Sequence, residues 1–307
     1  MKRIFCLLIA LLCISACAEL NVVCSIFPQY DFTKFIAGDK AAVTQLLPAG
    51  MDSHEYEASP RDIISLNRAD LFIYTDDELE QWLTAVKGSL DSVTLVRCAE
   101  GIDLEALNEE WEELHEDHEE EEHEHEHEHA YDAHIWLDPT LASVMADNIL
   151  SALCEKDPSN AAYYTENCEV LKNKLTELDE KFSALFAAHP DCTLYFGGKF
   201  AYSHFIRHYG VEFVTAYSGC SDDGEPSVRT IVHMLRGMRN SSAKVIFTDE
   251  LSNGEIAKTI AAEADCEVLL FHTCHNLSKL DSGLTYFDIM EMNYTNIERA
   301  LNESDNP

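Results

Sequence analysis

A long amphipathic segment in the middle of the chain constrains the fold most. From Pro158 onward, apolar residues recur at spacings of three, four and seven, at Tyr164, Leu171, Leu175, Leu178, Phe182 and Leu185. This spacing predicts one helix of roughly 28 residues, longer than the roughly 8–20 residues usual in globular proteins. We expect the helix to end at His189-Pro190, and a helix of this length can join two separate halves of a molecule.

An alternation of strand-like and helix-like segments lies on both sides of this helix. Apolar, β-branched runs predict strands at 21–26, 42–47, 71–74 and 93–96, and again at 193–196, 211–215, 244–248 and 267–271. Helical patterns lie at 31–37, from Ser59-Pro60 onward, and at 138–153, 200–208, 227–238, 255–264 and 284–300. Strand–helix alternation favours parallel sheets built from βαβ units. We therefore expect an α/β protein of two similar halves, residues 20–157 and 190–307, joined by the helix at 158–189. A ligand cleft between the halves follows, at the carboxyl ends of the strands.

The charge balance excludes several classes of partner. The 307 residues hold 56 acidic and 21 basic side chains, a net charge of −35. Nucleic-acid binding needs clustered Lys and Arg, and so does docking of a basic patch on an anionic membrane surface. The composition is instead typical of an anionic protein that attracts cations.

The start of the chain is typical of an export signal. Met1-Lys2-Arg3 is basic, Ile4–Ile14 is uncharged, and small residues lead to Cys17, a pattern that resembles a bacterial lipobox. We expect a signal peptide at 1–16 and lipidation of Cys17, the alternative being an ordinary signal peptide cut near Ala18. Either reading places the mature protein outside the cytoplasmic membrane, lipid-anchored or periplasmic. No later stretch reaches the roughly 18 apolar residues of a membrane span.

An acidic and histidine-rich tract occupies Glu109–His129, with 13 acidic residues, 6 histidines and no basic residue. It formally contains the HExxH protease signature, but it has no apolar face that could pack as a zincin helix. The remaining readings are a metal-gathering tract and a plain solvated loop. We expect a disordered loop that is dispensable for tight binding, because a segment without an apolar face cannot offset its ordering entropy.

Two other histidines lie in loops that the strand pattern places at the cleft. His54 directly follows the strand expected at 42–47 and precedes the helix at Ser59-Pro60. His134 lies just before Asp138-Pro139, where another helix opens. A single histidine is more often structural, but the repeated arrangement marks both as candidate metal ligands.

The residues around these histidines resemble a known family. Pro48–Pro60 is similar to the first metal motif of the zinc/manganese ABC-transporter solute-binding proteins, and Asp132–Pro139 to the second, with Ala133 where proline is usual. Glu225-Pro226-Ser227, Thr285–Met290 with Asn293, the histidine-rich insert, the lipobox and the long helix also resemble the family.

The resemblance implies two Rossmann-like lobes, a rigid connecting helix and one divalent metal held in the cleft. It further implies delivery of that metal to an ABC permease, without chemistry on it, by a protein that we expect to be a monomer and not an enzyme. Imidazole ligands favour Zn²⁺, with Mn²⁺ as the alternative. Two rival readings are an adhesin of the same family and a zinc metallohydrolase with Glu225 or Glu250 as base. The motifs GxSxG, GxGxxG and Walker A are absent from the sequence.

The sequence departs from the family in the second half of the site. Relatives usually place a His or Glu ligand ten residues before a Tyr-Gly pair, and here that position is Lys199, whose ammonium has no lone pair. We expect Lys199 to pair with a cleft carboxylate, and His204 and His208 to lie away from the metal. Relatives often carry a ligand Asp just after the last strand, where this chain has His272 and His275. The predicted ligands are therefore His54, His134, His272 and His275, with Glu225 as an alternative oxygen donor.

Two cysteines also follow strands of the second half, Cys220 and Cys274. We expect them to lie close together and, because the chain is exported, to form a disulfide. Thiolate ligation of the metal is the second reading.

Overall fold

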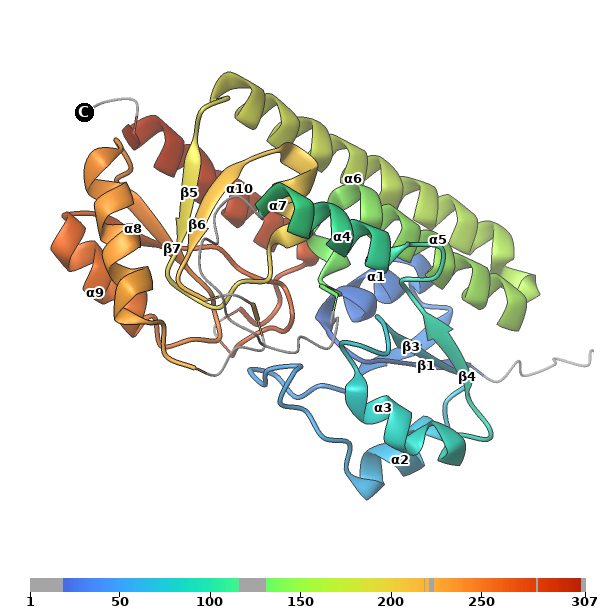
Figure 1. Ribbon diagram of the computed structural model, residues 1–307. Helices are drawn as coiled ribbons and strands as arrows, with labels where there is room; N and C mark the ends of the chain where they lie inside the picture. Colours follow the sequence, from blue (N-terminus) through green and yellow to red (C-terminus); the bar gives the residue numbers. More distant parts are fainter. Residues whose placement is uncertain (1–18, 116–130, 218, 221–223, 280, 305–307) are drawn as a thin grey trace, which may run out of the picture.

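Eight short strands form two parallel sheets in the computed structural model, which describes residues 19–115, 131–217, 219–220, 224–279 and 281–304 (Figure 1). The strands are β1 (Leu20–Cys24), β2 (Ala41–Gln45), β3 (Leu71–Tyr74), β4 (Thr94–Arg97), β5 (Thr193–Phe196), β6 (Glu212–Thr215), β7 (Val245–Thr248) and β8 (Glu267–Leu270). The first sheet has the order β2-β1-β3-β4 and the second the order β6-β5-β7-β8. The two lobes thus repeat one topology, and the predicted α/β class with two parallel sheets is confirmed.

Helices cover both faces of each sheet. In the first lobe they are α1 (Phe27–Ala37), α2 (Pro60–Leu66), α3 (Gln81–Val86), α4 (Leu104–His115) and α5 (Pro139–Lys156). In the second lobe they are α7 (Ser203–Tyr209), α8 (Val228–Asn240), α9 (Glu255–Ala264) and α10 (Tyr286–Ser304). Short 3₁₀ turns lie at η1 (Lys87–Ser89), η3 (Ile135–Leu137) and η4 (Pro158–Asn160).

The predicted joining helix is present as α6 (Ala161–Ala188), which has 28 residues (Figure 1). Its buried stripe consists of the six residues named from the sequence together with Cys168 and Phe186. The helix packs against α1 and α5 of the first lobe and against α7 and α10 of the second. One continuous apolar core follows it, from Val22 in β1 to Phe271 after β8. Burial of its apolar stripe against helices of both lobes therefore fixes α6 in place, and both lobes pack on this one helix.

Helix caps determine where the loops of the cleft end. Ser59 caps α2, accepting a hydrogen bond from the backbone N–H of Asp62. Asp138 caps α5, accepting from the backbone N–H of Thr140 at 2.8 Å. Pro60 and Pro139 occupy the first turns, where a missing N–H costs nothing. The loop with His54 therefore ends at the capped start of α2, and the segment with His134 ends at the capped start of α5.

Some elements differ from the sequence-based expectation. Helix α1 begins at Phe27, four residues before Asp31, and α3 was not expected. The predicted acidic loop does not begin at Glu109, because α4 continues to His115; residues 116–129 of that tract lie outside the described residues. The signal segment and Cys17 also lie outside them. Within the described part of the chain, no helix combines the length and apolarity needed to cross a bilayer.

Candidate metal centre

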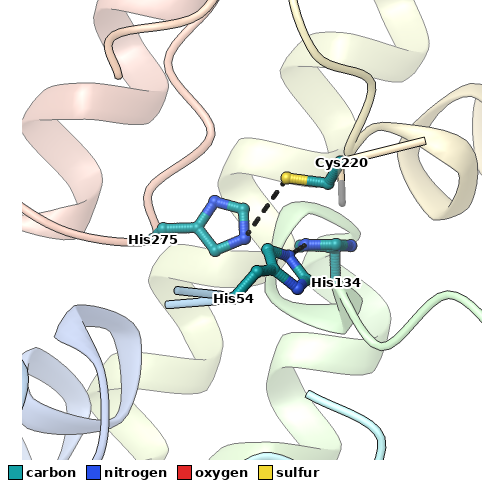
Figure 2. A group of neighbouring side chains, drawn as sticks. All are labelled: His54, His134, Cys220 and His275. Carbon is teal, nitrogen blue, oxygen red and sulfur yellow. Dashed lines mark hydrogen bonds between the residues drawn. The ribbon is translucent and has the colours of Figure 1, made fainter. Parts of the chain in front are cut away.

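Four side chains converge between the lobes: His54, His134, Cys220 and His275 (Figure 2). Their possible ligand atoms all lie within 4.8 Å of one another. His54 follows β2, Cys220 follows β6 and His275 follows β8, while His134 lies before η3 in the segment that leads from β4 to α5. The loops with His54, Cys220 and His275 follow the carboxyl ends of edge strands, where open parallel sheets bind ligands, and His134 lies in the segment between α4 and η3.

The distances within the group match the coordination of zinc. The Nε2 atoms of His54 and His134 are 3.2 Å apart, and Zn–N bonds of about 2.0–2.1 Å in a tetrahedron place two nitrogens about 3.3 Å apart. The Sγ of Cys220 is 3.9 Å from Nε2 of His275, against about 3.6 Å expected with a Zn–S bond of about 2.3 Å. The ring centroids of His134 and His275 are 4.5 Å apart. These two pairs are therefore spaced for a small tetrahedral cation, and the wider separations in the group, up to 4.8 Å, would contract around it.

A carboxylate orients His134. Its Nδ1 hydrogen-bonds to Oδ1 of Asp132, which leaves Nε2 to face the other ligands. The hydroxyl of Ser203 donates to the other oxygen of Asp132, and Nε2 of His204 lies 2.8 Å from the backbone oxygen of Asp132. Burial acts to raise the pKa of Asp132, but the charge and hydrogen bond of His134 outweigh it and lower that pKa well below its usual range. The carboxylate–imidazole pair is the arrangement that fixes a metal-ligating histidine.

His275 is oriented by a longer chain of contacts. Its Nδ1 lies 2.6 Å from Oγ1 of Thr273, and that hydroxyl donates to Glu250 at 2.6 Å. With a cation on Nε2, Nδ1 keeps its proton and donates it to Thr273. Trp136 packs edge-on against the ring of His275, with centroids 5.1 Å apart.

Burial disfavours the charged forms of His54, His275 and Cys220. Burial in the cleft, aided by His134, lowers the pKa of His54 to about 4. Burial also lowers the pKa of His275 well below its usual value and raises the pKa of the Cys220 thiol well above its own. Neutral imidazoles carry a lone pair for a metal, so the pocket is suited to a cation.

The sequence profile of the ZnuA family, described as zinc-uptake complex component A, periplasmic, matches residues 22–300. The chain belongs to this family. It is 33% identical over 288 residues to the high-affinity zinc uptake system protein ZnuA of Bacillus subtilis, covering 92% of this chain and 88% of that protein. It is 30% identical to the zinc-binding protein AdcA of Streptococcus pyogenes over 90% of this chain, which spans 55% of the AdcA length. The crystal structure of the metal-dependent lipoprotein YcdH of Bacillus subtilis matches with a TM-score of 0.77 and 29% identity, covering 92% of this chain and 100% of that chain.

Three of the predicted ligands meet in this family member, and one does not. His272 lies outside the group, although it follows the same strand as His275. Asn293 of α10 binds both the backbone N–H and the backbone oxygen of His272, at 2.8 and 2.9 Å. The His272 ring faces away, its Nδ1 accepting from the N–H of Cys274 at 2.9 Å. The alternative donor Glu225 is exposed and is also absent from the group.

The expected disulfide between Cys220 and Cys274 is wrong, because both are free cysteines. The backbone of Cys274 has a positive φ of 60°, and its Sγ faces Met290 of α10 at 3.9 Å. Cys220 instead faces the imidazoles, in line with the second reading, thiolate ligation. The signal in the sequence was a cysteine directly after a strand that ends at the cleft.

Lys199, His204 and His208 lie as the sequence predicted. The sequence predicted that Lys199 pairs with a cleft carboxylate, without naming one, and the Nζ of Lys199 lies 3.7 Å from Oδ2 of Asp52. His204 and His208 are not members of the metal group, and Nε2 of His208 lies 2.8 Å from Asp179 on α6.

Proposed function

We propose that this protein captures Zn²⁺ outside the cytoplasmic membrane through His54, His134 and His275, and delivers it to an ABC permease. The observation that carries the proposal is the convergence of three imidazoles, two of them with Nε2 atoms 3.2 Å apart. Zinc is favoured over Mn²⁺ because imidazole suits zinc, whereas Mn²⁺ prefers carboxylate and carbonyl oxygens. Relatives with zinc-uptake and zinc-binding names support the same metal.

The proposed role is binding and release without turnover. The family is one of solute-binding proteins, and the residues that support the site hold ligands in place instead of activating a water. We extend the proposal to a monomeric protein anchored by lipid at Cys17, with lobes at 20–157 and 190–307. A cavity of about 210 Å³ lined by His54, His134 and Cys220 gives the cation a route into the site.

The proposal is tested by calorimetric titration of the metal-free protein with zinc. We expect one tight site, and His134→Ala should weaken it by roughly 100- to 1000-fold, since four ligands share about 10–16 kcal/mol of binding free energy. His233→Ala, at an exposed position on α8, is the control and should leave the zinc affinity unchanged. Equal zinc affinity in the His134→Ala variant and the wild type would refute the site.

A further inference from the structure

We infer that Cys220 is the fourth ligand, bound as a thiolate, and that this sulfur makes the site selective for Zn²⁺ against Mn²⁺. The inference rests on the proposed function, because it assigns the one coordination position that the three imidazoles leave open.

The surroundings of Cys220 differ from those of the other thiols. Its Sγ lies 3.9 Å from Nε2 of His275, the nitrogen that faces the centre of the group (Figure 2). The Sγ atoms of Cys168 and Cys266 face backbone oxygens, and the Sγ of Cys24 faces the hydroxyl of Thr33. Cys220 is also the cysteine in the metal group found among the described residues. A thiol that faces a lone-pair nitrogen of a three-histidine cluster is placed to share a cation with it.

The nearby carboxylates are engaged elsewhere. Asp132 binds His134 and Ser203. Glu250 accepts two hydrogen bonds from Thr273, one from the hydroxyl and one from the backbone N–H. Among the described residues, the group that could hold a metal contains no carboxylate.

Asp52, the third nearby carboxylate, is held in the same way. It accepts from the backbone N–H of His54 at 2.9 Å and lies 3.7 Å from the Nζ of Lys199. Oxygen donors, which Mn²⁺ prefers, thus support the ligands instead of binding the metal. Three nitrogens and one sulfur form a donor set that suits zinc and disfavours manganese.

Cys220 closes the site on its accessible side. It lines the cavity of about 210 Å³ together with His54 and His134, whereas His275 is fully buried and is not part of that lining. Binding of the cation there replaces the S–H bond of Cys220 by an S–Zn bond, and the proton leaves to solvent.

The test is substitution of the metal by Co²⁺ in wild type, Cys220→Ser and Cys220→Asp, with Cys266→Ser as the control. Co²⁺ reports a thiolate ligand through a near-ultraviolet sulfur-to-metal charge-transfer band. We expect this band in the wild type and in Cys266→Ser, and its loss in both Cys220 variants. Thermal melts of the metal-free variants check that each is folded.

Competition between Zn²⁺ and Mn²⁺ measures selectivity on the same proteins. Cys220→Ser should weaken zinc by roughly 100-fold. Cys220→Asp should narrow the ratio of zinc to manganese affinity, because it supplies a carboxylate. A wild-type Co²⁺ complex without the band, or an unchanged affinity ratio in Cys220→Asp, would overturn the inference while tight zinc binding kept the proposed function intact. Failure of the wild type to bind zinc would instead refute the proposed function.

Discussion

The two lobes share one strand order but hold their ligands in different ways. In the first lobe, His54 and His134 lie on loops of that lobe and are supported there by Asp52 and Asp132. In the second lobe, His275 lies on a loop that is attached to the first lobe. Phe27 of α1 donates its backbone N–H to the oxygen of His275 at 3.2 Å.

The next residue of that loop strengthens the attachment. The side-chain amide of Asn276 donates to the backbone oxygens of Pro48 and Met51 at 2.6 and 3.0 Å. Gly50 donates to the oxygen of Leu277 at 2.9 Å. The three imidazoles therefore lie on one connected support, and Cys220 lies on a separate loop of the second lobe, between β6 and α8.

The largest expected difference is between the two histidines after β8. His275→Ala should weaken zinc by roughly 100- to 1000-fold, because it removes a ligand. His272→Ala should weaken zinc less than about tenfold, because its ring faces Cys274 and not the metal group. Calorimetric titration of both variants measures this, and a greater loss in His272→Ala would reverse the assignment.

A second comparison uses two buried glutamates that follow equivalent strands, Glu80 after β3 and Glu250 after β7. Glu250 reaches His275 through Thr273, so Glu250→Gln should weaken zinc by about 10-fold or more, as outer-shell changes do. Glu80 binds Ser25 and the backbone N–H groups of Thr75 and Asp76, so Glu80→Gln should leave the zinc affinity unchanged. Equal losses in the two variants would mean that the support of His275 is not specific.

A smaller effect is expected from the attachment of the loop itself. Asn276→Ala removes three hydrogen bonds to the first lobe, those to Pro48, Met51 and Gln45, and should weaken zinc several-fold while destabilising the fold by about 1–3 kcal/mol. Asn302→Ala, at an exposed position on α10, is the matched control. Zinc titration and urea unfolding test both, and an unaltered Asn276→Ala protein would show that the attachment does not hold His275.

The smallest change in zinc affinity is expected for Glu80→Gln, which should instead alter how the stability of the fold depends on pH. Burial raises the pKa of Glu80 from 4.5 to about 7. The folded state therefore binds this proton more tightly than the unfolded state, and the stabilisation is present below about pH 4.5 and lost as the pH rises to about 7. Glu80→Gln should remove this dependence, worth about 3 kcal/mol at about 1.4 kcal/mol for each pKa unit. Urea unfolding at several pH values compares the two proteins, and identical pH profiles would contradict the prediction.

The sequence predicted the fold and the convergence of the two first-lobe histidines because their signals are local. Apolar runs located each strand to within one or two residues at its ends, and the spacing of buried residues located α6. His54 and His134 each lie a few residues before a capped helix, so the ends of their loops could be predicted from the sequence. The six-residue helix α3 was missed because so short a segment shows little periodicity.

The second-lobe ligands depend on side-chain directions within an irregular loop. His272 and His275 are three residues apart, with Cys274 at a positive φ between them; the ring of His272 lies beside Glu250 and Asp281, and the ring of His275 lies in the metal group. The spacing of apolar residues does not predict side-chain directions in such a loop. The position of Cys220 in the metal group depends on how the two lobes pack against each other. The sequence of its own loop does not determine that packing.

Three imidazoles and the Cys220 sulfur form the metal shell that we propose. X-ray absorption at the zinc edge of the zinc-loaded wild type tests it most directly. We expect three nitrogen neighbours at about 2.0–2.1 Å and one sulfur at about 2.3 Å from the zinc. A shell of nitrogen and oxygen alone, without sulfur, would contradict it.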